Sequence, residues 1–438
     1  MLILHNQNLL DLMRCQYSLE DIQGITRFLE SQKTLSFSPL ENGLFPAAAV
    51  VAKTAYTGYS NVWVRDNIYL AYTHYFCHKS EIAIKTIKTL IKYFQKHQNR
   101  FQDIIDGKVN KNEIMKRPHI RFNGETLEEI DQEWSHAQND ALGYFLWFTC
   151  KLIREKILII KPNELEILAL FPFYFEAISY WEDEDSGHWE EDRKIEASSI
   201  GVVVAALTEL KLLVLETSDQ VYCQNKNNIV SLELLDKLIN KGQETLNKIL
   251  PDECIQDPPQ TRKYDAALLF LIYPLQLIEG EMAEKIVNNV INNLQGDYGI
   301  KRYLGDSFWC RDYQEIPEVI RTTISSEREQ WFKDNNRELR LREEAQWCIF
   351  DPIISAIFGI KFQQTNQPEY LEKQTYYLNR SLGQLTPSDS QFGGLKCPEL
   401  YYLKQGVYFP GDATPLLWTQ ANLKVALKMM EKSLSMDN

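Results

Sequence analysis

Three residues, Trp63, Arg65 and Asp66, bring together an aromatic ring, a cation and a carboxylate. Arg65 offers a planar fork of hydrogen-bond donors, and Asp66 can accept hydrogen bonds from two adjacent hydroxyl groups. The ring of Trp63 can cover the apolar face of a pyranose. The motif therefore suits a sugar, although a helix cap is an alternative, because the helix dipole favours a carboxylate near a helix N-terminus.

A second group of chemically capable residues lies in an acidic segment, Tyr180–Ser199, with seven carboxylates between residues 182 and 192. Two of its glutamates, Glu182 and Glu190, each follow a tryptophan directly. A carboxyl group held against an indole and beside other carboxylates has a raised pKa, which a general acid needs near neutral pH. Both glutamates are candidates, and a solvated acidic turn is the alternative for the segment.

Two further polar segments lie at Trp134–Asp140 and Lys396–Gly406. The first is placed at the predicted start of a buried helix. The second contains Glu399 in a stretch rich in Pro and Tyr that does not read as a helix. On residue type alone, Glu399 would be an ordinary surface residue.

The elements that must position these residues are mostly helices. Apolar residues recur at helical spacing in six long segments, and period-two runs are short and rare. The predicted helices are 81–97, 137–156, 196–216, 231–250, 346–360 and 414–434, with a further helix over 68–77. Segments that are apolar nearly all round alternate with amphipathic ones. This alternation predicts an all-α fold with buried helices inside, half-exposed helices outside, and a site on loops at one end.

The composition of the chain excludes two classes of function, binding to nucleic acids and binding to anionic membranes. The 438 residues include 47 Lys and Arg against 60 Asp and Glu, a net charge of −13. Such a chain lacks the basic surface that nucleic acids and anionic membranes require. We expect a cytoplasmic location, since we find neither a signal peptide nor an apolar run of about 18 residues. The eight cysteines contain no Cys-x-x-Cys pair, and we expect them to be reduced, with no metal site and no cofactor.

Seven segments occur in an order that is typical of one family. They are Gly43–Tyr69, Glu133–Trp147, Asp185–Leu207, Tyr264–Pro274, Glu344–Phe358, Pro398–Leu403 and Pro415–Leu427. With this set the chain resembles the catalytic domain of glucoamylases, glycoside hydrolase family 15. Within that family it most resembles the glucoamylase-like domain at the start of the phosphorylase kinase α and β subunits. The resemblance covers residues 40–430, and the ordered set is specific although each segment alone is weak.

The resemblance implies an (α/α)6 barrel of six inner and six outer helices. No linker or shift in composition marks a boundary, so we expect a single domain over residues 1–438. It also implies an inverting, exo-acting α-glucosidase that releases glucose from the non-reducing ends of α-glucans or maltooligosaccharides. The two carboxyl groups of an inverting pair lie about 6.5–9.5 Å apart, which leaves room for the attacking water. The substrate would be the only partner that the resemblance names, and the oligomeric state stays open.

The family's motifs fall on particular residues of this chain. The general acid of the family follows a tryptophan and precedes another acid, which assigns it to Glu190, and the general base falls on Glu399. The remaining candidates are binding residues: Arg65 and Asp66 for the terminal glucose, Trp63, Trp134 and Trp189 as walls of the pocket, and Gln138, Asp140 and Glu191 as lining or support.

Several alternatives remain open at this point. Glu182 is a second candidate for the acid, and the segment from Glu190 to Glu196 is shorter than in the kinase subunits. A non-catalytic glucan-binding or regulatory module of the phosphorylase kinase type would keep the sugar-binding motif without requiring both catalytic carboxylates. A hydrolase of the same fold acting on trehalose or α-1,6-linked glucose is the third possibility, because one fold supports several chemistries.

Overall fold

The structure is a computed structural model. It describes residues 3–48, 58–216, 224–225, 228–321, 323–337 and 342–436. The chain divides into two compact units, and each is described by itself. Unit 1 comprises Met1–Ser38, Pro46–Ser60 and Tyr264–Asn438, and unit 2 comprises Pro39–Phe45 and Asn61–Lys263. The expectation of a single domain stays a prediction.

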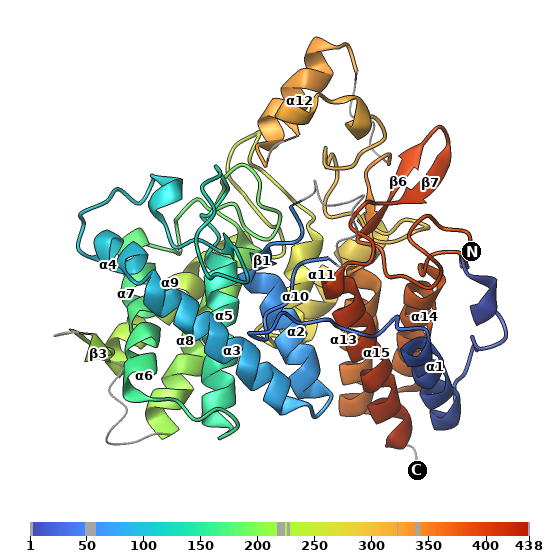
Figure 1. Cartoon of the computed structure of the whole chain (residues 1–438), viewed down its shortest axis with the longest axis horizontal. Coiled ribbons are helices and arrows are strands. Elements are labelled where there is room, and N and C mark those ends of the chain that lie inside the picture. The colour runs from blue at the N-terminus through green and yellow to red at the C-terminus, as the bar shows by residue number, and fades with distance from the viewer. Residues whose placement is uncertain are drawn as a thin grey trace. The chain divides into compact units, whose positions relative to one another are not determined.

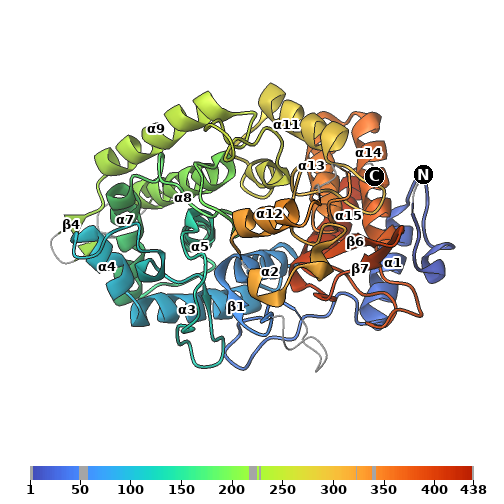
Figure 2. The same ribbon diagram turned by 90° about the horizontal axis from the view of Figure 1, so that it is seen from above.

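Unit 2 is built around three buried helices, α2 (Val64–Phe76), α5 (Asn139–Arg154) and α8 (Ala197–Glu216). In Figure 2, α5 lies next to both α2 and α8, while α3 and α9 cover their outer sides. The surrounding helices are α3 (Ser80–Lys96), α4 (Asn99–Ile105), α6 (Pro162–Leu168), α7 (Leu170–Ile178) and α9 (Leu232–Ile249). Short strands pair as β1 (Val62–Trp63) with β2 (Arg121–Phe122) and β3 (Gln224–Asn225) with β4 (Asn228–Ile229).

The sequences of these helices explain their places. The outer helix α9 begins after Ser231, whose side chain accepts a hydrogen bond from the Leu234 N–H, and buries one apolar stripe. The inner helix α8 is apolar enough to cross a membrane by length and composition, but 72 % of its most apolar window is buried in the structure. A core helix passes the same test. The window is not an unbroken apolar run, because Glu209 and Lys211 interrupt it.

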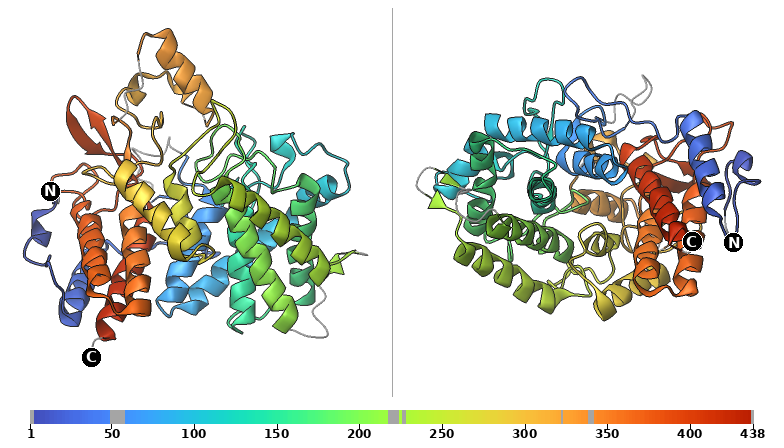
Figure 3. Two further views of the ribbon diagram at one scale, coloured as in Figure 1. Left: turned by 180° about the vertical axis from the view of Figure 1, so that it is seen from behind. Right: turned by 90° about the horizontal axis from the view of Figure 1, so that it is seen from below.

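Unit 1 repeats the arrangement. Its buried helices are α10 (Leu269–Ile272, preceded by the 3-10 turn Ala266–Leu268), α13 (Phe350–Thr365) and α15 (Leu417–Ser435). The half-exposed helices α11 (Gly280–Asn293), α14 (Pro368–Gly383) and α1 (Leu19–Ser31) pack against them, which Figure 3 shows from below. Helix α12 (Ser325–Asp334) projects away from the other helices of the unit (Figure 1). One antiparallel sheet has the strand order β5 (Gln346–Trp347), β6 (Leu400–Lys404), β7 (Val407–Pro410).

The predicted alternation of buried and amphipathic helices is confirmed: among the described residues, each unit holds three buried helices with half-exposed partners. Two predicted boundaries were wrong. Helix α2 begins at Val64 instead of Ile68, because the Val64 N–H donates to the Ile120 carbonyl at 2.9 Å where β1 pairs with β2. Gln346 and Trp347 form a strand, since they pair with Tyr401 and Leu400.

Candidate functional site

The first turn of α2 places the predicted sugar-binding motif in the interior of unit 2. Trp63 is the N-cap residue, so Arg65 and Asp66 lie inside the helix instead of before it. Only 3 % of Arg65 and 7 % of Asp66 is exposed. Two ionisable side chains at this depth require either fixed partners or an altered pKa.

Arg65 finds these partners in two other segments of unit 2. Its Nε donates to Asp140 Oδ2 at 2.7 Å, and its Nη2 donates to Gln138 Oε1 at 2.7 Å and to the Gly187 carbonyl at 3.1 Å. Gln138 and Asp140 lie at the start of α5, as the sequence placed them. The guanidinium is therefore held in one orientation, with its remaining terminal nitrogen, Nη1, 3.8 Å from Glu190 Oε1.

A tight turn presents Glu190 to Arg65. Glu190 has a φ of +59°, a backbone conformation that costs free energy in residues other than glycine. Gly187 has a φ of +50°, and a Cβ at this position would collide with the Glu196 carboxylate. The Glu191 N–H donates to the Ser186 carbonyl at 3.2 Å, which closes the turn. Strain of this kind at a predicted catalytic residue is a feature of functional sites.

The surroundings of Glu190 suit a group that exchanges a proton. Burial raises the pKa of Glu190 above its ordinary value, while the charges of Arg65 and Arg121 and hydrogen bonds from Gln138 and Trp63 oppose this rise. Burial also raises the pKa of Asp66 to about 7; Arg65 opposes the rise and Glu190 adds to it. Glu190 is thus a carboxyl group with a raised pKa beside two cations, which suits a group that donates a proton.

The acidic segment is not a uniform solvated turn. Glu182 is exposed, whereas Glu191 is buried and forms an ion pair with Arg262 at 3.2 Å. Asp183 accepts two hydrogen bonds from Arg117, at 2.6 and 2.8 Å. Of the two candidate acids, the burial and the cation beside it favour Glu190 over Glu182.

A further buried aspartate anchors the turn, and sequence reasoning did not single it out. Asp185 Oδ2 accepts from the Asn139 N–H at 2.8 Å and from Ser199 Oγ at 2.5 Å. Burial raises the pKa of Asp185 well above its ordinary value, and the charges of Glu196 and Asp140 add to this. Asp185 thus joins the turn to the first residues of both α5 and α8.

Two predicted aromatic walls lie side by side in unit 2. The rings of Trp63 and Trp134 meet edge to face, with centroids 6.0 Å apart. The guanidinium of Arg121 lies over both rings, 4.1 Å from the centroid of Trp134 and 5.1 Å from that of Trp63. Trp189 is 8 % exposed, with its ring centroid 6.0 Å from that of His188. Sequence reasoning missed Arg121, because the strand that carries it is two residues long and shows no periodicity.

Glu399 belongs to unit 1, where it directly precedes β6. The expectation from residue type was wrong, since only 4 % of this glutamate is exposed. Its N–H donates to the Ala413 carbonyl at 3.1 Å and its carbonyl accepts from the Cys348 N–H at 2.9 Å, so its backbone is fixed. The hydroxyl of Tyr59 donates to Glu399 Oε1 at 2.8 Å. Tyr59 is a second residue that sequence reasoning missed.

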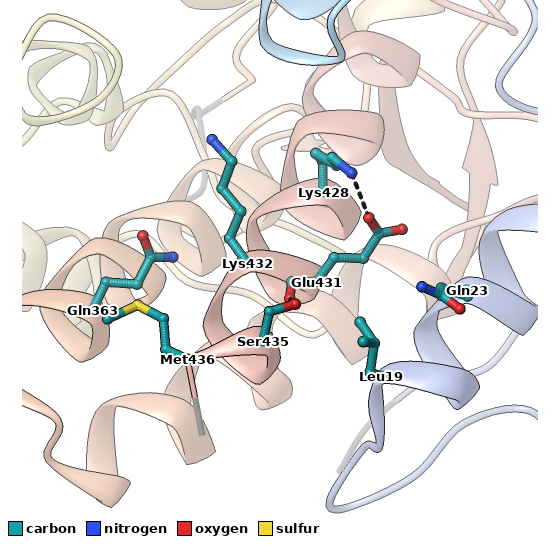
Figure 4. A pocket seen from close by; sticks show the side chains of 8 residues that line it. All are labelled: Leu19, Gln23, Gln363, Lys428, Glu431, Lys432, Ser435 and Met436. Carbon is teal, nitrogen blue, oxygen red and sulfur yellow. Dashed lines mark hydrogen bonds and ion pairs between the residues drawn. The ribbon is translucent and has the colours of Figure 1, made fainter. Parts of the chain in front are cut away.

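Two other features of the described residues were considered as sites. A surface pocket of about 480 Å³ lies in unit 1 between α1, α13 and α15 (Figure 4). It contains the ion pair of Lys428 and Glu431, and none of the predicted site residues line it. His74 and His78 have a spacing that metal sites use, but α2 ends at Phe76 and the described residues hold no cluster of three potential ligands.

Two relatives show what this chain is similar to in sequence. A probable phosphorylase b kinase regulatory subunit alpha of Caenorhabditis elegans is 25 % identical over 399 residues, which are 82 % of this chain and 30 % of that protein. The chain therefore spans less than a third of the kinase subunit's length. An uncharacterized lipoprotein of Escherichia coli, YgeQ, is 29 % identical over 206 residues, which are 42 % of this chain and 78 % of that protein.

Solved structures show the fold. A wild-type glycosidase has a TM-score of 0.62 and 15 % identity, covering 94 % of this chain and 97 % of its own. A glucoamylase from Saccharomycopsis fibuligera has a TM-score of 0.57 and 12 % identity, covering 95 % of this chain and 97 % of its own. These likenesses confirm the predicted all-α, (α/α)6 barrel class.

The family follows from a match over most of the chain. The model described as "Glycosyl hydrolases family 15" matches residues 26–335. This range includes the Trp63–Asp66 motif, the Trp134–Asp140 segment and the acidic segment, and it confirms the resemblance stated from the sequence. The chain belongs to glycosyl hydrolases family 15.

Proposed function

We propose that the protein is an inverting, exo-acting α-glucosidase that releases glucose from the non-reducing ends of α-glucans or maltooligosaccharides. One observation supports this most: Glu190 is a largely buried carboxyl group beside a fixed guanidinium, and burial raises its pKa. A structural ion pair alone would not need the left-handed backbone that turns Glu190 toward Arg65.

In this proposal Glu190 is the general acid. Its carboxyl group protonates the glycosidic oxygen as the bond to the terminal glucose breaks. Arg65 Nη1 stabilises the carboxylate that remains, since its other donors are already engaged with Asp140, Gln138 and Gly187. Asp66 and the indole of Trp63 bind the terminal glucose. Neither a metal ion nor an organic cofactor takes part.

Glu399 is the proposed general base. It accepts a proton from the water that attacks the anomeric carbon on the opposite face of the ring, which inverts the configuration. The hydrogen bond from Tyr59 to Oε1 holds the carboxylate of Glu399 in a fixed orientation. This assignment rests on the family resemblance and on the immediate surroundings of Glu399 within unit 1.

A second candidate function is a non-catalytic, glucan-binding or regulatory module. The relative in Caenorhabditis elegans is named a regulatory subunit, and this chain corresponds to 30 % of it. Such a module would bind sugar through Trp63, Arg65 and Asp66 and would release no glucose. Hydrolysis of trehalose or of α-1,6-linked glucose is the third candidate, which differs only in the linkage cleaved.

Glucose release separates the candidates. The wild type is incubated with maltose, maltooligosaccharides, isomaltose and trehalose, and the anomer of the product is followed by NMR. We expect β-glucose from the α-1,4-linked sugars and a loss of about 100-fold or more in kcat for Glu190→Gln. The matched control is Glu182→Gln, which alters an exposed glutamate of the same segment and should keep activity.

Four other results would each overturn a different part of the proposal: the activity, the assignment of the acid, the stereochemistry or the substrate. Sugar binding without glucose release would support the regulatory module. Loss of activity in Glu182→Gln but not in Glu190→Gln would reverse the assignment of the acid. Release of α-glucose would exclude an inverting mechanism, and cleavage of trehalose or isomaltose alone would change the substrate.

A further inference from the structure

Arg121 occupies an unusual position between two aromatic rings. It lies on β2, where its backbone pairs with that of Trp63 on β1. Only 5 % of Arg121 is exposed, and its guanidinium carbon is 4.1 Å from the ring centroid of Trp134 and 5.1 Å from that of Trp63. The two indoles are themselves in contact. We call these three side chains the tryptophan–arginine stack.

The geometry of the stack suits arginine specifically. A planar guanidinium can lie flat on an indole, and this attraction is stronger when water is excluded. Arg121 Nη1 also donates to Gln132 Oε1 at 2.9 Å, which fixes the orientation of its plane. A lysine would keep the charge but would lose the flat contact and this directed hydrogen bond.

The stack borders the proposed acid. The indole of Trp63 donates a hydrogen bond to Glu190, and the charge of Arg121 lowers the pKa of Glu190 against the larger effect of burial. The buried indole N–H of Trp134 has no hydrogen-bond partner among the described residues. Buried donors are usually hydrogen-bonded, so this N–H is a candidate donor to a sugar hydroxyl.

We propose that Arg121 is a positioning residue of the sugar site, which holds Trp63 and Trp134 together as one aromatic wall and supplies a second positive charge beside Glu190. The inference deepens the proposed function and rests on it for its kinetic consequences. The contact between Arg121 and the two rings is independent of that function.

Two variants of Arg121 separate the effect of its planar shape from the effect of its charge. Arg121→Lys keeps the charge, so we expect KM for maltose to rise about tenfold while the pH profile stays in place. Arg121→Gln removes the charge as well, so KM should rise and the alkaline limb of kcat/KM should move to higher pH. The sign follows because the cation stabilises the Glu190 carboxylate, and without it the acid stays protonated to higher pH.

The control is Arg27→Gln, which removes an exposed arginine of α1 and should change neither KM nor the pH profile. A general structural role for Arg121 would lower the yield or kcat of both variants equally, with the alkaline limb unmoved. That result would overturn the proposal, as would wild-type KM values in both variants.

Two measurements that need no hydrolysis, maltose binding and denaturant unfolding, test the role of Arg121 even if the proposed function is wrong. If the wild type releases no glucose, maltose binding is measured by tryptophan fluorescence. Weaker binding by both Arg121 variants would then support the proposal that Arg121 holds Trp63 and Trp134 together. In addition, the denaturation midpoints of Arg121→Gln, Trp134→Phe and the double variant form a cycle that needs no substrate. A strictly additive cycle, or unchanged maltose binding in the variants, would overturn the proposal.

Discussion

Arg65 donates its Nε–H to Asp140 Oδ2 at 2.7 Å, and the side chains are 3 % and 0 % exposed. This pair joins the first turn of α2 to the first turn of α5. Through Gly187, the same guanidinium reaches the turn that carries Glu190. One buried cation therefore links three segments of unit 2 that are far apart in the sequence, and its removal should affect both stability and function.

The first prediction concerns Asp140→Asn. The substitution keeps the shape but leaves the buried Arg65 without its carboxylate, so we expect a loss of about 3 kcal/mol in the free energy of unfolding. Denaturant titration at pH 7 measures this. The matched control is Glu128→Gln, which removes the exposed ion pair with Lys96 and should cost less than about 1 kcal/mol. If both variants lost the same free energy of unfolding, the buried Arg65–Asp140 pair would stabilise the fold no more than an exposed pair does, and the prediction would be wrong.

Much of this arrangement was predictable from the sequence. The alternation of apolar and amphipathic helices followed from helical periodicity, which burial enforces over many residues. The Trp63–Asp66 motif and the acidic segment stood out because residues of their types are unusual neighbours. The start of α5 placed Gln138 and Asp140 correctly, since a polar cluster preceded a long apolar run.

The remaining features depend on contacts between distant segments. Arg121 meets Trp63 through strands of two residues, which are too short to show any periodicity. The hydrogen bond from Tyr59 to Glu399 joins residues 340 positions apart. The left-handed backbone of Glu190 also has no signature in a residue type that rarely adopts it. Local pattern reading cannot detect such features.

The second prediction concerns Tyr59→Phe. The change removes the hydroxyl that donates to Glu399 Oε1 at 2.8 Å and leaves the ring. If Glu399 is the base, kcat should fall about 10- to 100-fold with little change in KM, as expected for a lost hydrogen bond to a charged group. The steady-state kinetics of maltose hydrolysis measure both constants.

A second tyrosine–glutamate pair provides the control for this variant. Tyr75 donates to Glu155 Oε2 at 2.7 Å on the exposed surface of unit 2, so Tyr75→Phe should keep full activity. A Tyr59→Phe enzyme with unchanged kcat would remove the support that this contact gives to Glu399 as the base.

The third prediction concerns Asp66, whose burial raises its pKa from 3.8 to about 7. In the unfolded chain this carboxyl group ionises near pH 4, whereas in the folded protein it keeps its proton up to about pH 7. A group with a raised folded-state pKa destabilises the fold progressively as pH rises through this interval. A shift of this size corresponds to about 4 kcal/mol at pH 8.

Asp66→Asn removes this cost because the amide carries no charge. We expect the variant to be more stable than the wild type at pH 8, by up to about 4 kcal/mol, and the difference to shrink toward pH 5, where the wild-type side chain is protonated. At pH 8, where the wild-type group is ionised, sugar affinity should fall, because the amide replaces one of the two accepting oxygens with an NH2 donor. Denaturation at both pH values, with the exposed Asp131→Asn as control, measures the difference. A stability difference that does not depend on pH would show that Asp66 is ionised throughout and that a charged carboxylate is tolerated at this depth.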